Sequence, residues 1–248
     1  MNSRAEHEIA HGKKLTAGNP EEIWGWSTPA GKRRAERRGE MIRRDSALGP
    51  GTTALEIGCG SGMFTEILAH SGAKILAVDI SEDLLQIARE RSLLPEQVQF
   101  VAKRFEDCIL NGPFDAVVGS SVLHYLEIKP ALEKIFELLK PGGWMCFTEP
   151  NMLNPQIMIQ KNIPWIKERM NDSPDETAFF RWPLQSMLEK IGFTAVHITP
   201  FDWLHPYTPE RMINSVAITG LWLEKVPILR EIAGSLYIRA QRPAKVIL

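Results

Sequence analysis

The sequence predicts an α/β fold: a doubly wound, seven-stranded, mostly parallel sheet with an inserted cap. Two observations support this fold class. Short apolar runs alternate with helical patterns from about residue 52 onward, which is typical of βαβ units. A glycine-rich turn also follows the first apolar run and directly precedes a helical pattern. Composition agrees, since 44% of the 248 residues are hydrophobic and 24% are charged, as in globular proteins.

Each element follows from the local pattern. Apolar runs predict strands at 52–57, 74–80, 98–102, 114–119, 144–148, 194–199 and 234–240. Amphipathic periodicity predicts helices at 29–47, 62–71, 82–92, 130–140, 183–191 and 209–224. Residues 1–28 are mostly polar and are expected to form an N-terminal arm. The domain then covers 29–248, and the segment 151–181, which breaks the alternation, is interpreted as the cap.

Charge, cysteine content and hydropathy exclude several classes. A net charge of −1 argues against non-specific nucleic-acid binding. The 3 cysteines form no CxxC pair, so neither a disulfide framework nor a metal site is expected, and a cytoplasmic location fits best. No apolar stretch is long enough to span a membrane, and no feature sets an oligomeric state. Seven basic residues in 32–44 allow either peripheral contact with an anionic surface or a solvated helix face.

The glycine-rich turn, 58–62, carries the first functional signal. Gly58, Gly60 and Gly62 occupy every second position between a strand and a helix, where backbone N–H groups can approach a ligand. A dinucleotide fingerprint would place its third glycine at 63, which is Met63. The spacing therefore favours a different adenosine-type ligand over a nicotinamide dinucleotide.

Asp79 ends the next strand and carries the second signal. A carboxylate at that edge can accept hydrogen bonds from both ribose hydroxyls, or it can cap the following helix. Its position behind the glycine turn favours the ribose.

At this point the sequence resembles the class I S-adenosylmethionine-dependent methyltransferases, in particular the small-molecule group typified by quinone-precursor methylases. Four segments carry the resemblance, in the expected order: 56–62, 77–81, 114–118 and 139–143. The resemblance implies a Rossmann-like fold, S-adenosylmethionine as cofactor and methyl transfer as the reaction. It also implies that Glu56 faces the amino group of the methionine moiety and that Asp79 binds the ribose.

The remaining cofactor contacts are assigned by the same resemblance. Many relatives have Gly-Asp after the third strand, whereas this chain has Lys103-Arg104. The implied cofactor-binding residues are Glu56, Gly58, Cys59, Gly60, Gly62, Asp79, Ile80, Arg104, Phe105, Glu106, Ser120 and Ser121.

The acceptor is expected to be a small molecule. The segment 119–122 lacks the Asn/Asp-Pro-Pro-aromatic clamp of nucleobase and protein-amide methyltransferases. Aromatic side chains in the cap and in 201–207 indicate an apolar or ring-bearing acceptor of lipid, quinone or natural-product type: Trp165, Phe179, Phe180, Trp182, Trp203 and Tyr207. Two alternatives stay open, a nicotinamide-dependent oxidoreductase and a non-catalytic cofactor-binding partner of another enzyme.

Several residues have two interpretations. His124 and His205 are the candidates for a general base, because histidine titrates near neutral pH; a reaction without a protein base is the alternative. Trp24 and Trp26 either form a lid over the site or simply dock the arm. The acidic-aromatic run 172–182 either binds the acceptor or caps the following helix through Glu176 or Thr177.

Overall fold

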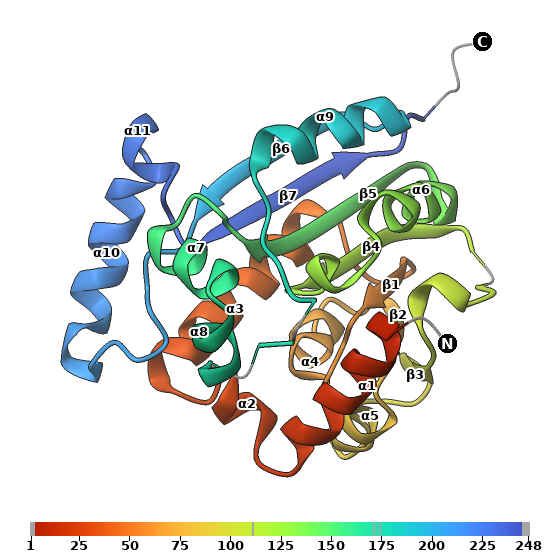
Figure 1. Ribbon diagram of the computed structural model, residues 1–248. Helices are drawn as coiled ribbons and strands as arrows, with labels where there is room; N and C mark the ends of the chain where they lie inside the picture. Colours follow the sequence, from red (N-terminus) through yellow and green to blue (C-terminus); the bar gives the residue numbers. More distant parts are fainter. Residues whose placement is uncertain (1–2, 111, 171, 174, 245–248) are drawn as a thin grey trace.

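One seven-stranded sheet forms the centre of the molecule (Figure 1). The computed structural model describes residues 3–110, 112–170, 172–173 and 175–244. The strand order is β3-β2-β1-β4-β5-β7-β6. β7 pairs antiparallel with both β5 and β6, whereas the pairs among β1 to β5 are parallel. The predicted fold class is confirmed.

The strands lie close to their predicted positions: β1 (Thr53–Ile57), β2 (Lys74–Asp79), β3 (Val98–Ala102), β4 (Phe114–Ser120), β5 (Leu139–Pro150), β6 (Thr194–Phe201) and β7 (Ser235–Gln241). β5 is longer than the expected 144–148. Leu139 already pairs with Phe114, and the register shifts before Ala116 pairs with Trp144. The N–H of Gly142 donates to the carbonyl of Arg242 at 2.9 Å, so the expected turn is held against the chain that follows β7.

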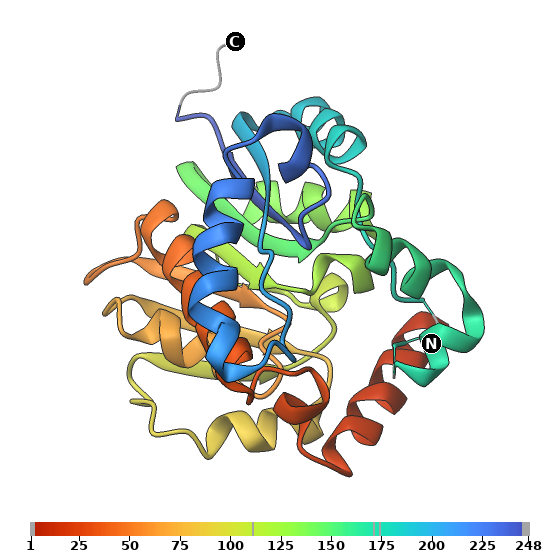
Figure 2. The same ribbon diagram turned by 90° about the vertical axis from the view of Figure 1, so that its left-hand side faces the viewer.

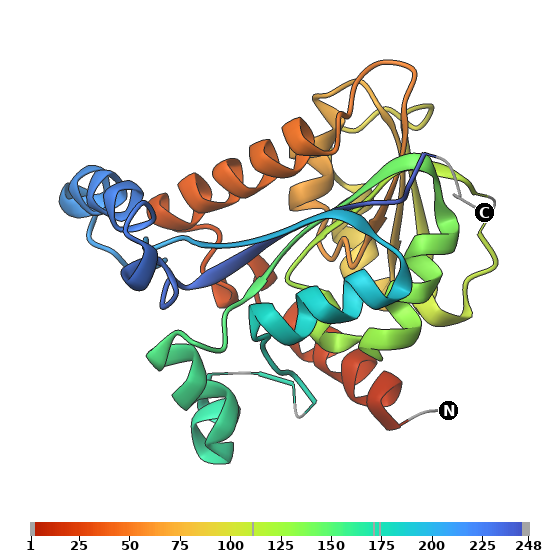
Figure 3. The same cartoon turned by 90° about the horizontal axis from the view of Figure 1, so that it is seen from above.

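Helices cover both faces of the sheet (Figure 3). Buried side chains of α3 (Pro29–Asp45), α4 (Met63–Ala69) and α5 (Glu82–Arg89) pack on one face, and those of α6 (Ile128–Leu138) and α9 (Arg181–Ile191) pack on the other. Successive residues of a strand contribute to opposite faces: Val117 belongs to one core, and its neighbours Ala116 and Val118 belong to the other. The central strands are therefore apolar on both sides, which explains their unbroken hydrophobic runs.

The carboxyl ends of the strands are covered by two segments that are far apart in the sequence. The N-terminal segment forms α1 (Ser3–Thr16) and α2 (Pro20–Ile23), and the cap contains α7 (Pro155–Asn162) and α8 (Pro164–Arg169). Figure 2 shows α1 beside the cap, and the His7–Asp175 ion pair of 2.8 Å joins them. Helices were not predicted in the arm.

The basic helix α3 directs three of its arginines toward the C-terminal half of the chain, while Lys32, Arg33 and Arg44 are exposed. Arg34 and Arg38 both bind Asp202 at 2.9 Å, and Arg37 binds Glu224, at the end of α10 (Ile213–Leu223). These ion pairs attach α3 to the C-terminal half of the chain and account for three of its seven basic residues. The short α11 (Pro227–Arg230), which was not predicted, follows α10. No helix in the described part of the chain is both long and apolar enough to cross a bilayer.

Candidate active site

The turn between β1 and α4 brings backbone N–H groups to the carboxyl edge of the sheet. Gly58 has φ +67, and a Cβ there would lie 2.2 Å from Val122, so the position accepts only glycine. Gly60 has φ +52, and its N–H donates to Oδ2 of Asp79 at 2.8 Å. The turn is thereby tied to the end of β2.

Asp79 lies beside this turn rather than at the start of α5. Its Oδ1 accepts a hydrogen bond from the N–H of Ser81 at 2.8 Å. The residue that caps α5 is Ser81, whose Oγ accepts from the N–H of Leu84 at 3.3 Å. Burial raises the pKa of Asp79, while hydrogen bonds from backbone N–H groups oppose the rise. The capping interpretation of Asp79 is wrong, and its carboxylate lines the cavity described next.

A cavity of about 640 Å³ extends from the glycine turn to the cap. It brings together ten of the twelve predicted cofactor-binding residues: Gly58, Cys59, Gly60, Asp79, Ile80, Arg104, Phe105, Glu106, Ser120 and Ser121. Ser121 adopts φ +56, and its N–H donates to the carbonyl of Thr148 at 2.7 Å, so β4 and β5 hold the wall beneath the expected methyl group.

Glu56 and Gly62 do not line this cavity. Glu56 is buried below the turn, and its Oε2 has no hydrogen-bond partner among the described residues. Burial raises the pKa of this carboxyl to about 7. Gly62 is the N-cap of α4 with φ +77, and a Cβ there would meet Ala88 of α5, so it serves the packing of two helices.

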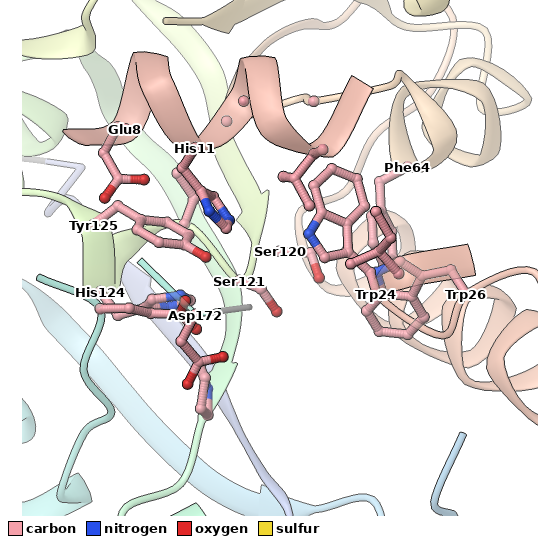
Figure 4. Close-up of a pocket in the computed structure, with 18 of the residues that line it drawn as sticks. Glu8, His11, Trp24, Trp26, Phe64, Ser120, Ser121, His124, Tyr125 and Asp172 are labelled. Carbon is pink, nitrogen blue, oxygen red and sulfur yellow. Dashed lines mark ion pairs between the residues drawn. The ribbon is translucent and has the colours of Figure 1, made fainter. Parts of the chain in front are cut away.

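Both tryptophans of the arm cover the glycine turn. A Cβ on Gly60 would lie 3.4 Å from the Trp24 ring, and Trp26 packs edge-on against Phe64 at 5.6 Å. Figure 4 shows both rings beside Phe64 at the end of the cavity away from His124. The arm thus docks on the domain and also closes this side of the cavity, which combines the two interpretations of these residues.

The two candidate bases have different surroundings. His124 is 2% exposed; its Nδ1 donates to Oε2 of Glu149 at 2.5 Å, and its Nε2 has no hydrogen-bond partner among the described residues. His205 accepts a hydrogen bond from the N–H of Tyr207 on Nδ1, and its Nε2 lies 3.2 Å from the amide of Gln156. Both nitrogens of His205 are engaged, so of these two residues only His124 has a ring nitrogen without a hydrogen-bond partner among the described residues.

The acceptor end of the cavity is more polar than the sequence predicts. Trp203 and Tyr207 line it, but Trp165, Phe179, Phe180 and Trp182 do not. Trp165 and Trp182 are 63% and 51% exposed, so these two cap aromatics do not form part of the cavity wall. The cap contributes Lys161, Asp172 and Glu176 instead. Glu176 does not cap α9, because it binds Lys161 and lies 3.6 Å from Nε2 of His124.

Comparison with known proteins assigns the family. Residues 55–145 match the family model described as a methyltransferase domain. Nodulation protein S of Sinorhizobium fredii is 30% identical over 139 residues, covering 54% of this chain and 62% of that protein. Ubiquinone biosynthesis O-methyltransferase of Xylella fastidiosa is 32% identical over 127 residues, covering 48% of this chain and 52% of the relative. The matched region thus spans between half and two thirds of each relative.

The fold comparison extends over the whole domain. The crystal structure of the N-methyltransferase NodS from Bradyrhizobium japonicum, in complex with S-adenosylhomocysteine, superposes with a TM-score of 0.63 at 17% identity, covering 95% of this chain and 98% of that one. Residues 55–145 therefore match a methyltransferase domain, and the chain has the fold of the class I S-adenosylmethionine-dependent methyltransferases. Its family match favours this assignment over the nicotinamide-dependent alternative.

The lining of the cavity fits S-adenosylmethionine on two structural observations. The glycine turn brings backbone groups to the cavity, and Asp79 presents a carboxylate at the end of β2. Gly58 and Gly60 would border the methionine moiety, Asp79 would hold the ribose, and the 104–106 segment would contact the adenine.

Sequence reasoning missed the contribution of α1 to the methyltransferase site. The residues of α1 that line the cavity are Arg4, Ala5, Glu8, His11, Gly12 and Leu15. Their spacing of three and four residues places them on one face of a helix. That periodicity was the available signal; it was obscured because this face mixes polar and apolar residues.

Proposed function

We propose that this methyltransferase transfers the methyl group of S-adenosylmethionine to a small, ring-bearing acceptor that binds between α1, the cap and the loop 203–207. The observation that carries the proposal is the single cavity, which joins the glycine turn to the cap. Its volume of about 640 Å³ lies within the ordinary range for small-molecule sites. The family match and the name of one relative, a ubiquinone biosynthesis O-methyltransferase, support the same reaction class.

The protein's part in this reaction is alignment and exclusion of water. Bound S-adenosylmethionine supplies an electrophilic methyl group on a positively charged sulfur. Ser120 and Ser121 lie at the end of β4 and form the wall between the two parts of the cavity. α1 and the cap cover the opening, so that an acceptor held in line is shielded from solvent.

His124 is the proposed general base. The hydrogen bond from Nδ1 to Glu149 leaves the lone pair of a neutral ring on Nε2, at the cavity. The other carboxylate oxygen, Oε1 of Glu149, accepts from the N–H groups of Val122 and Leu123 at 2.9 and 2.8 Å. Glu149 is therefore a positioning residue, which fixes the ring orientation of His124.

The ring of the acceptor is proposed to contact Trp203 and Tyr207. Trp203→Ala should raise the KM for the acceptor about tenfold, because the contact area of one aromatic side chain is lost. The matched control is Trp165→Ala, which removes an exposed tryptophan outside the cavity and should leave KM unchanged. Equal KM values in the two variants would place the acceptor elsewhere.

A labelled-methyl assay tests the reaction itself. The protein is incubated with S-adenosylmethionine carrying a tritiated methyl group and a panel of small aromatic amines, alcohols and phenols. We expect label in one class of acceptor, together with release of S-adenosylhomocysteine. Cofactor binding without transfer to any acceptor would instead support the non-catalytic partner protein.

A further inference from the structure

Carboxylates from three separate segments converge at the acceptor end of the cavity. Glu8 of α1 and Asp172 and Glu176 of the cap line the cavity, and Glu149, near the end of β5, is buried behind His124. Figure 4 shows Glu8 and His11 pointing from α1 toward Tyr125 and His124, with Asp172 on the opposite side. Ser173 donates a hydrogen bond to Glu8, which ties α1 to the cap.

Fewer permanent positive charges oppose them. Lys161 binds both Asp172 and Glu176, and Arg4 donates to the carbonyl of His124 at 2.7 Å. Among the lining residues that the structure describes, the part of the cavity around His124 has three carboxyl groups, Glu8, Asp172 and Glu176, against two permanent cations, Arg4 and Lys161, while Arg34 and Asp202 pair with each other. Burial raises the pKa of Glu8 to about 7; the hydrogen bond from Ser173 opposes this rise, and the charge of Glu176 adds to it.

His124 supplies a second, independent observation. Its side chain is buried and lines the cavity, but Nε2 lacks a hydrogen-bond partner within the described chain. The nearest carboxylate oxygen, Oε1 of Glu176, is 3.6 Å away, too far for a hydrogen bond. A buried nitrogen of this kind is costly unless a ligand satisfies it.

The Tyr125 hydroxyl shows how burial and these carboxylates change the pKa of a phenol. Burial, followed by the charges of Glu176 and Glu8, raises the pKa of the Tyr125 hydroxyl well above its usual range. A phenolic acceptor beside the same carboxylates would likewise resist ionisation. An ammonium group would be attracted to them, and it becomes a neutral nucleophile on losing one proton.

We propose that the acceptor is an amine, and that its ammonium form binds among Glu8, Asp172, Glu176 and the unpaired Nε2 of His124. This inference rests on the proposed function, and it adds the identity of the atom that is methylated. The relatives leave that atom undecided, since one is named an O-methyltransferase and the other an N-methyltransferase.

The chemistry balances with the residues present. The ammonium gives one proton to Nε2 of His124, and Glu149 and Glu176 offset the positive charge that forms. The nitrogen lone pair then bonds to the methyl carbon, the carbon–sulfur bond breaks, and its electron pair stays on sulfur. The product is the methylated ammonium with S-adenosylhomocysteine.

Three matched pairs of probes test the inference: benzylamine and benzyl alcohol, 2-phenylethylamine and 2-phenylethanol, and tryptamine and tryptophol. Each pair shares a ring and differs in nitrogen against oxygen. Binding is measured by calorimetry on protein saturated with S-adenosylhomocysteine, and labelled-methyl transfer is measured in parallel. In at least one pair the amine should bind about tenfold more tightly than the alcohol and should be the member that is methylated.

Variants that neutralise single carboxylates test which residues cause the preference for the amine over the alcohol. Glu8→Gln and Asp172→Asn should each reduce the amine preference about tenfold while S-adenosylhomocysteine still binds. The control, Glu168→Gln, removes an exposed carboxylate of the same cap outside the cavity and should change nothing.

Two results would overturn the inference in distinguishable ways. If S-adenosylhomocysteine binds but no pair favours the amine, the amine inference is wrong and the proposed function stands. If S-adenosylhomocysteine does not bind the wild type, the proposed function itself is wrong.

Discussion

The two ends of the cavity are built from the chain in different ways. The cofactor end comes from consecutive strand ends, where β1, β2 and β4 deliver Gly58, Asp79 and Ser120 to one edge of the sheet. The acceptor end is assembled from α1, the cap and the loop 203–207, which are up to 200 residues apart. Short motifs therefore describe the first end, whereas the second exists only after the chain has folded.

The energetics of the two ends also differ. Glu56 and Glu8 both have a pKa raised to about 7, and burial is the main cause for each. Glu56 is enclosed by the sheet below the turn and does not reach the cavity, but Glu8 is only half-buried and lines it. We therefore expect changes at Glu56 to alter stability and changes at Glu8 to alter acceptor binding.

The largest expected effect concerns the acceptor end. His124→Asn should lower kcat by about 10²- to 10⁴-fold, as for loss of a general base, with affinity for S-adenosylhomocysteine unchanged. His205→Asn is the matched control, and its kcat should stay within about threefold of wild type, since both its nitrogens are already engaged. Wild-type turnover in His124→Asn would show that the reaction needs no base there.

A substitution at Glu149 tests whether this residue positions the ring of His124. Glu149→Gln should lower kcat less than His124→Asn does and should shift the pH profile of kcat, because the ring loses its charged partner. A lower kcat with an unchanged pH profile would assign Glu149 a structural part only.

The next largest effect is expected on stability, at the buried ion pair between Arg38 of α3 and Asp202. Asp202→Asn leaves Arg38, 3% exposed, without its carboxylate partner and should reduce the free energy of unfolding by about 3–5 kcal/mol. Urea denaturation measures the change. The control is Glu40→Gln, which breaks an exposed pair with Arg43 and should leave the urea midpoint unchanged.

Much of the cofactor end could be predicted from the sequence, since ten of its twelve assigned residues line the cavity. Glycine spacing and a strand-end aspartate are local patterns with local structural consequences. The acceptor end could not be predicted in the same way. Trp165 and Trp182 were expected at the acceptor and are exposed, while Glu8 and Lys161 reach it through tertiary contacts between α1 and the cap.

A smaller effect, on the pH dependence of the free energy of unfolding, is expected from Glu56. Its pKa is higher in the folded protein, about 7, than its ordinary value of 4.5, so the folded state binds a proton more tightly. The stability from this proton is complete below pH 4.5 and is lost as the pH rises through 7. Relative to Glu56→Gln, the wild type should lose on the order of 3 kcal/mol over that window, at about 1.4 kcal/mol per pKa unit. Parallel pH curves of the unfolding free energy for the two proteins would contradict this.

The most direct test of the two-part site is a calorimetric titration with S-adenosylhomocysteine, using NAD as the comparison ligand. We predict that S-adenosylhomocysteine binds the wild type and His124→Asn equally, and that NAD binds neither. Asp79→Ala should weaken binding by about 1.5–3 kcal/mol, or roughly 10- to 100-fold, because a charge-assisted ribose contact is lost, whereas Asp83→Ala should have no effect. Unchanged affinity in a folded Asp79→Ala protein, or binding of NAD in place of S-adenosylhomocysteine, would contradict the account.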